Sequence, residues 1–442
     1  MSHSSPNAPS SELFLDPLLP RDATQPSRSA HGASAEAWKK TVNTFHAKNP
    51  GAATNSIVLH NPHTEMPQLC PAQQLQDQLL ADAVRQITYS LVITDTDTPT
   101  HDIIAFIQAE VLLANYFFTH DRVLEGKYHS SAALSLALSC KLNLRPSSQY
   151  QNSGSRTLLS GLPPPEDHIQ LGERVNAFWT VHSLYQTWAV VLDSAASLWA
   201  GEGSFGARVE IPWPLSMDTC EKGQLSAADM EDRNIVMRFL NREDRPELIS
   251  LPPLALYCRA AILFANASRL ASKYNSNMFH QDRATFSEQF QCLHACITMF
   301  LKEITTLELI RPLRAFLVIS VLTRVALIRL HEHRSMDNHS RETCLAAANG
   351  ILTLLQRVKK NDFTYIDPIV AVLLYSTGDV YVTETARYKG SLKNNIGAED
   401  RTYTGSLAAS AEQLLIVMEE LEPICPLLAS RRRQFVVAVS SM

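Results

Sequence analysis

The sequence predicts an all-α protein, and three observations indicate that fold class. Apolar residues recur at spacings of three and four along most of the chain, which is the period of one helix face. No alternating apolar and polar run is long enough to supply the strands of a sheet. Glycine is scarce, with 15 residues among 442, which disfavours turn-rich β folds and glycine-rich phosphate loops. We therefore expect one large, irregular multi-helix domain.

Residues 1–72 differ in composition from the rest of the chain and are expected to form a disordered arm. Ser, Pro, Ala and Asn are frequent there, and a segment of that kind buries too little apolar surface to fold alone. Its one apolar patch, Glu12–Pro20, is interpreted as a local collapse, with docking on a partner as the alternative. Helical periodicity begins near Gln73, so the helical domain is expected over residues 73–442.

The segment Asp102–Leu144 predicts two helices joined by a short hinge. The first helix carries two apolar stripes, and a helix that is apolar over so much of its circumference is expected to be buried. The second, Tyr128–Leu142, is rich in Ser and Ala, whose small side chains let a neighbouring helix approach closely. Gly126 is placed at the hinge, where its backbone freedom is most useful.

A third buried helix is predicted at Gln170–Leu192, which holds the heaviest aromatic side chains of the chain. Its apolar residues form two stripes that together cover most of the helix surface. The segment that follows, Asp193–Glu231, is expected to be an irregular connector. Within it, Pro212 and Pro214 fix φ on either side of Trp213. This pattern predicts a rigid peg in extended chain, with the indole inserted into the bundle.

The second half of the chain predicts seven further helices. Their expected bounds are Leu251–Tyr274, Arg283–Glu308, Pro312–Arg334, Ser340–Lys360, Asp367–Tyr388, Ser406–Leu421 and Leu427–Ser440. Proline and asparagine residues between these segments are typical helix breakers. No repeat of fixed length is present, which argues against a regular helical solenoid.

The charge balance gives no electrostatic footprint for nucleic acid. The chain has 39 basic and 44 acidic residues, a net charge of -5, whereas DNA binding rests mainly on Lys and Arg that neutralise phosphates. Apolar runs stay below the roughly 18 residues of a membrane span, and the N-terminus lacks a signal-peptide pattern. We therefore expect a soluble, intracellular protein that does not enter a membrane. Its eight scattered cysteines are expected to be free and buried.

Three separated segments carry a family resemblance. They are LEGKYHSSAALSLAL (Leu124–Leu138), GERVNAFWT (Gly172–Thr180) and ARVEIPWPL (Ala207–Leu215). In order and spacing they resemble the fungal-specific transcription-factor domain, the middle homology region of fungal zinc-cluster regulators. Together they span roughly the second quarter of the chain.

The resemblance implies an all-α regulatory domain of a fungal RNA polymerase II transcription regulator. Such a domain acts in the nucleus, with a cytoplasmic pool left open, and tunes transcription through inducers or partner contacts. The partners implied are the transcription machinery or another regulator, with a second copy of this chain and a small-molecule inducer also open. A ligand would act by preferring one helix packing over another.

The family's zinc cluster has no counterpart in this sequence. The cluster needs six closely spaced cysteines that begin C-x2-C-x6-C, and no C-x2-C occurs here. We therefore expect no direct DNA contact and no cofactor for this chain, with zinc only if a cluster is encoded upstream of Met1. Two other functions stay open: a cluster-less interaction protein that is partner or antagonist of a full-length regulator, and an unrecognised all-α enzyme.

The known enzyme signatures are absent, and no catalytic residue or metal ligand is assigned. H-E-x-x-H, G-x-S-x-G, Walker and G-x-G-x-x-G patterns do not occur, so no enzyme is expected. Cys292 and Cys296 share a helix face with His294 between them, and core packing is preferred to metal binding. His331 and His333 are interpreted as a solvated helix end, because residues two apart point to different faces of a helix.

Five residues form the candidate pocket for a ligand or partner. Tyr128 and His129 lie at a helix junction, and Trp179, Trp188 and Trp213 could line a cavity between helices. The alternative assigns Tyr128 and His129 to hydrogen bonds at the helix ends. In that alternative the three indoles belong to the core, as aromatics at helical spacing usually do.

Overall fold

The computed structural model is a bundle of helices, and no strand occurs in the part of the chain that it describes. The described residues are 78–85, 100–145, 162–192, 209–223, 234–243, 248–274, 279–310, 313–334, 337–359, 361, 363–391 and 398–441. The all-α prediction is confirmed. The predicted arm, residues 1–72, lies outside the described residues.

The helices follow the predicted order. They are α3 (Thr100–Thr119), α4 (Val123–Ser139), α6 (His168–Val191), α7 (Met217–Glu221), α8 (Ile235–Leu240), α9 (Pro253–Ser272), α10 (His280–Ile310), α11 (Leu313–His331), α12 (Asn338–Leu355), α13 (Ile369–Ser391), α14 (Ala398–Leu421) and α15 (Leu427–Ser440). Two 3-10 turns, η5 (Leu248–Ser250) and η6 (Glu332–Arg334), and a short helical segment at residues 78–85 are also described. The seven helices predicted for the second half correspond to α9 through α15, whereas the short α7 and α8 are not among the predictions.

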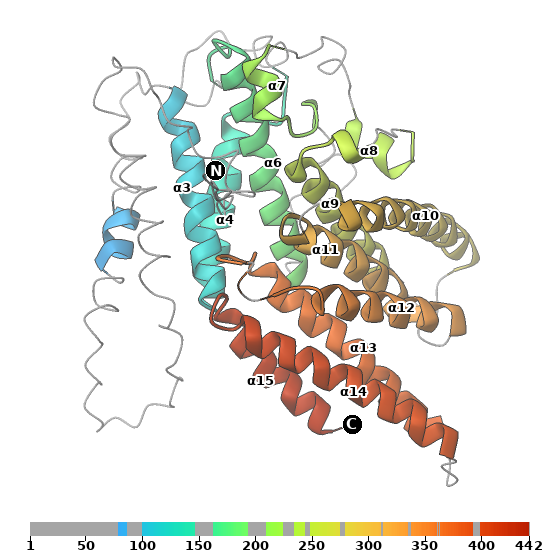
Figure 1. The fold of residues 1–442 in the computed structure, drawn as a ribbon. Coiled ribbons are helices and arrows are strands. Elements are labelled where there is room, and N and C mark those ends of the chain that lie inside the picture. The colour runs from blue at the N-terminus through green and yellow to red at the C-terminus, as the bar shows by residue number, and fades with distance from the viewer. Residues whose placement is uncertain are drawn as a thin grey trace, which may run out of the picture.

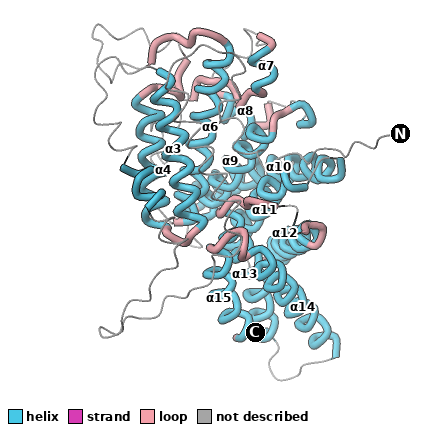
Figure 2. The backbone as a smooth tube through the Cα atoms, turned by 60° about the vertical axis from the view of Figure 1, so that its left-hand side comes forward, coloured by secondary structure: helices cyan, strands magenta, loops and turns pink. Residues whose placement is uncertain are grey.

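The helices form one body with α3, α4 and α6 at one side and α13, α14 and α15 at the far end (Figures 1 and 2). α3 and α4 lie side by side as a hairpin, and α6 packs on both. α9 and α11 fill the middle, with α10 and α12 against α11. A single hydrophobic cluster extends from α3 to α15.

α9 is the most enclosed helix of this arrangement. Every side chain from Leu254 to Ala265 is buried, because α6, α10 and α11 each pack against α9. Cys258 Sγ donates to Trp179 O of α6 at 3.7 Å, and Tyr257 Oη donates to Asp367 Oδ2 at 3.2 Å. The many alanines of α9 let these neighbours approach closely, since the interaxial distance depends on what projects at the contact.

Gly126 has a different role from the one that the sequence predicts. The chain reverses at Asp121, which has a φ of 60°, a left-handed conformation that aspartate tolerates better than most residues. Gly126 instead lies within the first turns of α4, with its N–H donating to Arg122 O at 3.0 Å. A Cβ at this position would come 2.5 Å from Phe118 Cδ1 of α3. The missing side chain therefore sets how closely α3 and α4 pack.

Phe118 cannot make room for a larger residue at 126. Its ring is fully buried and stacks on the indole of Trp188, with ring centroids 3.6 Å apart. We predict that Gly126→Ala lowers the free energy of unfolding by about 1–3 kcal/mol, as overpacking of a core does. Urea unfolding followed by circular dichroism measures this change.

Gly405→Ala in α14 is the matched control. Nothing lies within 4 Å of a Cβ built at Gly405, so alanine there should gain up to about 1 kcal/mol from helix propensity. Equal shifts in the two variants would contradict the packing role of Gly126.

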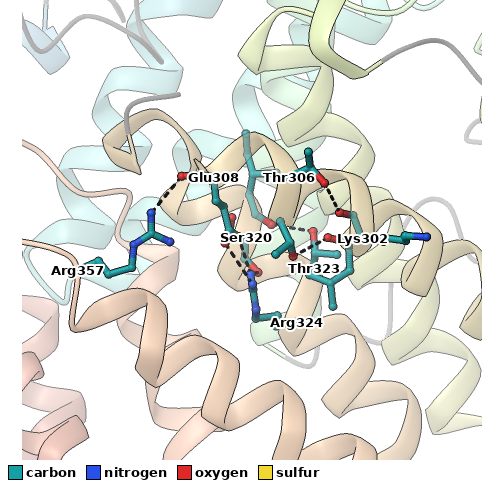
Figure 3. A network of polar contacts seen from close by, with 10 residues as sticks. Lys302, Thr306, Glu308, Ser320, Thr323, Arg324 and Arg357 are labelled. Carbon is teal, nitrogen blue, oxygen red and sulfur yellow. Dashed lines mark hydrogen bonds and ion pairs between the residues drawn. The ribbon is translucent and has the colours of Figure 1, made fainter. Parts of the chain in front are cut away.

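A buried ion pair joins α10, α11 and the residues that follow α12 (Figure 3). Arg324 Nη1 donates to Glu308 Oε1 at 2.8 Å, and Nη2 donates to Oε2 at 3.3 Å. Arg357 Nη2 donates to the main-chain oxygen of Glu308 at 3.1 Å. Buried charges need such complete partnering, because removing either member leaves the other charge desolvated.

The cysteines of the described residues are all free. Cys140, Cys220, Cys258, Cys296, Cys344 and Cys425 are buried, whereas Cys292 is half-buried. The prediction of free, buried cysteines is thus confirmed for these six positions, while Cys70 lies outside the described residues. Desolvation raises the pKa of Cys258 and of Cys425 to about 12 and that of Cys140 to about 11. The thiols of Cys258, Cys425 and Cys140 are therefore protonated at neutral pH.

Asp367 gives the fold a pH dependence. Its Oδ1 accepts from Ile369 N at 3.0 Å, and its Oδ2 accepts from Tyr257 Oη at 3.2 Å. Desolvation, only partly offset by these hydrogen bonds, raises the pKa of Asp367 to about 6. Because the folded pKa exceeds the unfolded one, this group stabilises the fold below about pH 4, and that stabilisation is lost as the pH rises through 6.

We predict that Asp367→Asn removes this loss. The amide keeps an oxygen for Ile369 N and, like a protonated carboxyl, carries no charge. Since Asp367 is only partly buried, the variant should be more stable than the parent by about 1–2 kcal/mol at pH 7.5 and nearly equal to it at pH 4. Thermal unfolding at both pH values tests this, with Asp379→Asn on the exposed face of α13 as control. A constant difference between the two pH values would refute it.

Candidate functional site

The peg around Trp213 is fixed to α6 by hydrogen bonds to the main chain. Trp179 Nε1 donates to Pro212 O at 2.7 Å. Asn176 Nδ2 donates to Leu215 O at 3.0 Å, and Leu215 N donates to Asn176 Oδ1 at 2.9 Å. One amide side chain thus pairs with both main-chain groups of Leu215, as a neighbouring strand would. This pair of hydrogen bonds holds the extended segment in place without a sheet.

The indole of Trp213 lies between two other groups. It stacks on Trp179, with ring centroids 4.8 Å apart and planes at 21°. The guanidinium carbon of Arg259 on α9 lies 4.7 Å from the Trp213 ring centroid and 5.1 Å from that of Phe239 on α8. Arg259 is only 2% exposed, so these cation–π contacts act in a desolvated place, where they are strongest. The predicted insertion of the peg is confirmed.

Two of the segments that resemble the family, residues 172–180 and 209–215, bond to each other in this region, and the first, Leu124–Leu138, lies in α4, which packs on α6. Glu210 N donates to Asn143 O at 2.8 Å, just past the end of α4. Arg145 Nε donates to Glu210 O at 3.3 Å. Together with the bonds from Asn176 and Trp179, these contacts tie residues 209–215 to both α4 and α6. Segments far apart in the sequence therefore form one interlocked unit, which we call the clasp (residues 124–145, 172–180 and 209–215).

His129 lies within α4 and faces α3. Its Nδ1 lies 2.6 Å from Glu110 Oε2, and both side chains are buried. The imidazole also stacks on Phe117, with ring centroids 5.1 Å apart. Tyr128 is 69% exposed, and its ring lies edge-on to that of His129, with centroids 5.0 Å apart. Of these two candidate residues, only Tyr128 is available to a partner at the surface.

Trp188 lines a small recess between α4 and α6. The lining residues are Lys127, Ser130, Tyr185, Trp188, Ala189 and Leu192. Its volume of about 10 Å³ is near the lower limit for one water molecule, whereas pockets for small molecules measure several hundred Å³. The recess is thus too small for a small-molecule ligand. Such a ligand would have to separate α4 and α6.

The structure brings only some of the five candidate residues together. Trp179 and Trp213 contact each other, whereas Trp188 stacks on Phe118 and His129 pairs with Glu110. Trp179 and Trp188 are fully buried, as the core alternative expects. The five residues thus make separate, packed ring contacts and do not line one open cavity.

Two titratable groups next to these rings, His182 and Tyr185, have shifted pKa values. The His182 ring lies 5.3 Å from that of Trp179, and burial together with the nearby Arg269 lowers the pKa of His182 to about 4. Burial also raises the pKa of Tyr185 at the recess. Both groups are therefore neutral at pH 7, whereas Arg259 is a cation in contact with the Trp213 ring.

Sequence reasoning favours a structural role for Asn176 without naming its partner, and it does not single out Arg259 or Glu110. Each is a polar residue inside an apolar helical stretch, which is a signal that a buried partner exists. The sequence could not name those partners, because they lie on other elements. Asn176 is nevertheless part of the GERVNAFWT segment that carries the resemblance.

The histidine and cysteine candidates are distributed as follows. Cys296 Sγ donates to Phe239 O at 3.6 Å and Cys292 Sγ to Leu240 O at 3.7 Å, so both pack against α8. His333 is 52% exposed in its side chain, as expected for a solvated helix end. The same interpretation is wrong for His331, which is 1% exposed because α10 and α12 cover the end of α11. Within the described ranges, no group of three or more His, Cys, Asp or Glu side chains is placed so that it could hold a metal ion.

No family model matches the chain, and neither a curated protein nor a solved structure matches it. Separately, none of the helices that the structure describes combines the length and apolarity needed to cross a membrane.

We predict that Asn176→Ala lowers the free energy of unfolding by about 2–4 kcal/mol. The change removes two hydrogen bonds and leaves the main-chain groups of Leu215 without their partner, which costs more than the bonds themselves. Urea unfolding measures the loss, and limited proteolysis should cut first near residue 215.

Asn115→Ala in α3 is the control for Asn176. Its Nδ2 donates only to Val111 O of its own helix, at 3.1 Å, so the variant should lose less than about 1 kcal/mol. If both variants unfold at the same urea concentration, the clasp does not depend on Asn176.

Proposed function

We propose that this chain is the regulatory domain of a transcription regulator. The supporting observation is the clasp, in which Asn176 and Trp179 of the second resembling segment hold the third, residues 209–215, by hydrogen bonds. The first resembling segment lies in α4, which packs on α6, and Glu210 N donates to Asn143 O four residues past the end of α4. An accidental resemblance would give no reason for these three segments to meet.

The domain acts by binding, and its expected readout is a change in helix packing. The recess next to Trp188 has room for about one water molecule, so a ligand there must favour a more open arrangement of α4 and α6. The buried Nε1–H groups of Trp188 and Trp213 have no hydrogen-bond partner among the described residues. Unsatisfied buried donors are costly, and a ligand or partner that supplies an acceptor gains that energy.

DNA contact belongs to this proposal only through an added zinc cluster. The net charge of -5 does not favour binding to phosphates, and the sequence has no C-x2-C. The chain would act on transcription either as part of a longer regulator in the nucleus or as a partner of one. The transcription machinery, a second regulator or another copy of the chain are the macromolecules that it would contact.

A reporter assay tests the proposal. The 442-residue chain is fused to an unrelated DNA-binding domain and expressed in a yeast host with a reporter gene under the matching operator. We expect transcription to differ about fivefold or more from that given by the DNA-binding domain alone, the lower range of ordinary allosteric coupling. Trp213→Ala, which removes the peg's indole from Trp179 and Arg259, should reduce this difference.

The matched control is Asp379→Asn on the exposed face of α13, away from the clasp. A fusion that is nuclear and abundant, yet changes transcription under none of several growth conditions, would contradict the proposal. Sequence-selective, salt-sensitive retardation of DNA by the purified chain would contradict the absence of direct DNA contact.

A further inference from the structure

α14 and α15 form an antiparallel helical hairpin, which has one face open to solvent. Five residues join the two helices, which pack against each other and against α13 (Figure 1). Arg432 of α15 pairs with Glu422 just past α14 and with Glu419 of α14, whose Oε2 lies 3.8 Å from Arg432 Nη1. This contact fixes which residues of the two helices lie level with each other. None of these residues belongs to the clasp.

Three apolar side chains are exposed on this face. One turn from Glu419 lies Ile416, which is 57% exposed. One turn from Arg432, in the same direction, lies Val436, and Val437 beside it is 73% exposed. Single exposed apolar residues are common, whereas this register places three together on adjacent helices, as at protein–protein contact sites.

The charges around the apolar patch are segregated between the two helices. The charged side chains of α14 from residue 402 onward are all acidic, and those of α15 are all basic. They are Glu412, Glu419 and Glu420 on α14, and Arg431, Arg432 and Arg433 on α15. Glu420 and Arg433 are both exposed. The face is therefore acidic on one helix and basic on the other, with the apolar patch spanning both.

We propose that this face binds a second copy of the chain in a two-fold symmetric dimer. A two-fold axis that runs along the face, between the hairpin helices and parallel to them, lays α14 of one protomer on α15 of the other. The acidic helix then meets the basic helix twice, because every contact of an isologous interface occurs in both directions. A surface that carries its own complement fits a copy of itself better than a partner of uniform charge.

The register of this dimer follows from the hairpin. Ile416 and Val436 lie level with each other within one protomer, so Ile416 of one protomer faces Val436 and Val437 of its partner. One turn away, Glu420 of one protomer faces Arg433 of its partner, and the symmetric pair lies beside it. Two pairs of opposite charge thus flank an apolar centre, which is the usual arrangement of a specific interface.

The size of the face fits a weak dimer. α15 has 14 residues and is about 21 Å long, and two adjacent helices are about 20 Å wide. Each protomer therefore contributes about 400 Å², roughly half of what a standard interface takes from each partner. We expect a dissociation constant on the order of 10–100 µM, so dimerisation would follow the local concentration of the chain.

The dimer supplies a surface for one of the partners that the proposed function leaves open. It rests on α14 and α15 and not on the clasp, so the dimer and the role in transcription can fail separately. Mass measurements on the purified chain test the dimer without reference to transcription.

Sedimentation equilibrium of the full-length chain over about 1–300 µM, which brackets the expected constant, is the test. We expect the average mass to rise from that of one chain toward that of two. Glu420→Arg and Arg433→Glu should each weaken the dimer about tenfold or more, because each creates two pairs of like charge in the symmetric interface. Glu303→Arg on the exposed face of α10 is the matched charge reversal and should leave the dimer unchanged.

Mixing the two hairpin variants is the decisive measurement. In a mixed dimer each reversed charge meets an opposite one, so dimers should re-form with about the affinity of the parent chain. Mixing cannot repair a defect in folding, so this result would be specific to the contact between copies. A parent chain that stays monomeric at about 300 µM, or a mixture no tighter than either variant alone, would overturn the proposal and assign the patch to a different partner.

Discussion

The burial of α9 on all sides is the constraint that places the other elements. A helix without a solvent face needs a neighbour along every stripe, and α6, α10 and α11 provide them. The polar groups of α9 then select which parts of these neighbours fit. Tyr257 reaches Asp367, two residues before α13, Cys258 reaches α6, and Arg259 lies against the rings of Trp213 and Phe239. The peg, α8 and the start of α13 are thus positioned by three consecutive side chains.

A tightly packed interior limits how such a domain can respond to a ligand. Phe118 and Trp188 stack at 3.6 Å between centroids, and Gly126 leaves no spare room beside them. Close-packed helices do not deform continuously, so a signal is transmitted as a change between discrete packings.

Much of the fold could be predicted from the sequence, because a long apolar pattern with the helical period identifies a helix without reference to the rest of the chain. α15 has the predicted bounds, and α9 to α13 begin and end within a few residues of those expected. The role of Gly126 could not be predicted from the sequence, because it depends on the nearby ring of Phe118 and not on the backbone conformation of Gly126. The interpretation of His331 as solvated is wrong because α10 and α12 cover it. A single sequence does not show which helices pack over the end of another. Asn176 and Arg259 depend on partners in other elements, and a single sequence contains no signal for such pairs.

The six buried cysteines give the chain a property that follows from packing alone. Each thiol is shielded from water, and desolvation holds it in the protonated form that reacts poorly with electrophiles and oxidants. While the helices stay together, alkylating reagents would find these sulfurs inert. Each transient opening of a helix would expose the thiol beneath it. The rate at which a given cysteine is modified would therefore report how often that part of the bundle opens.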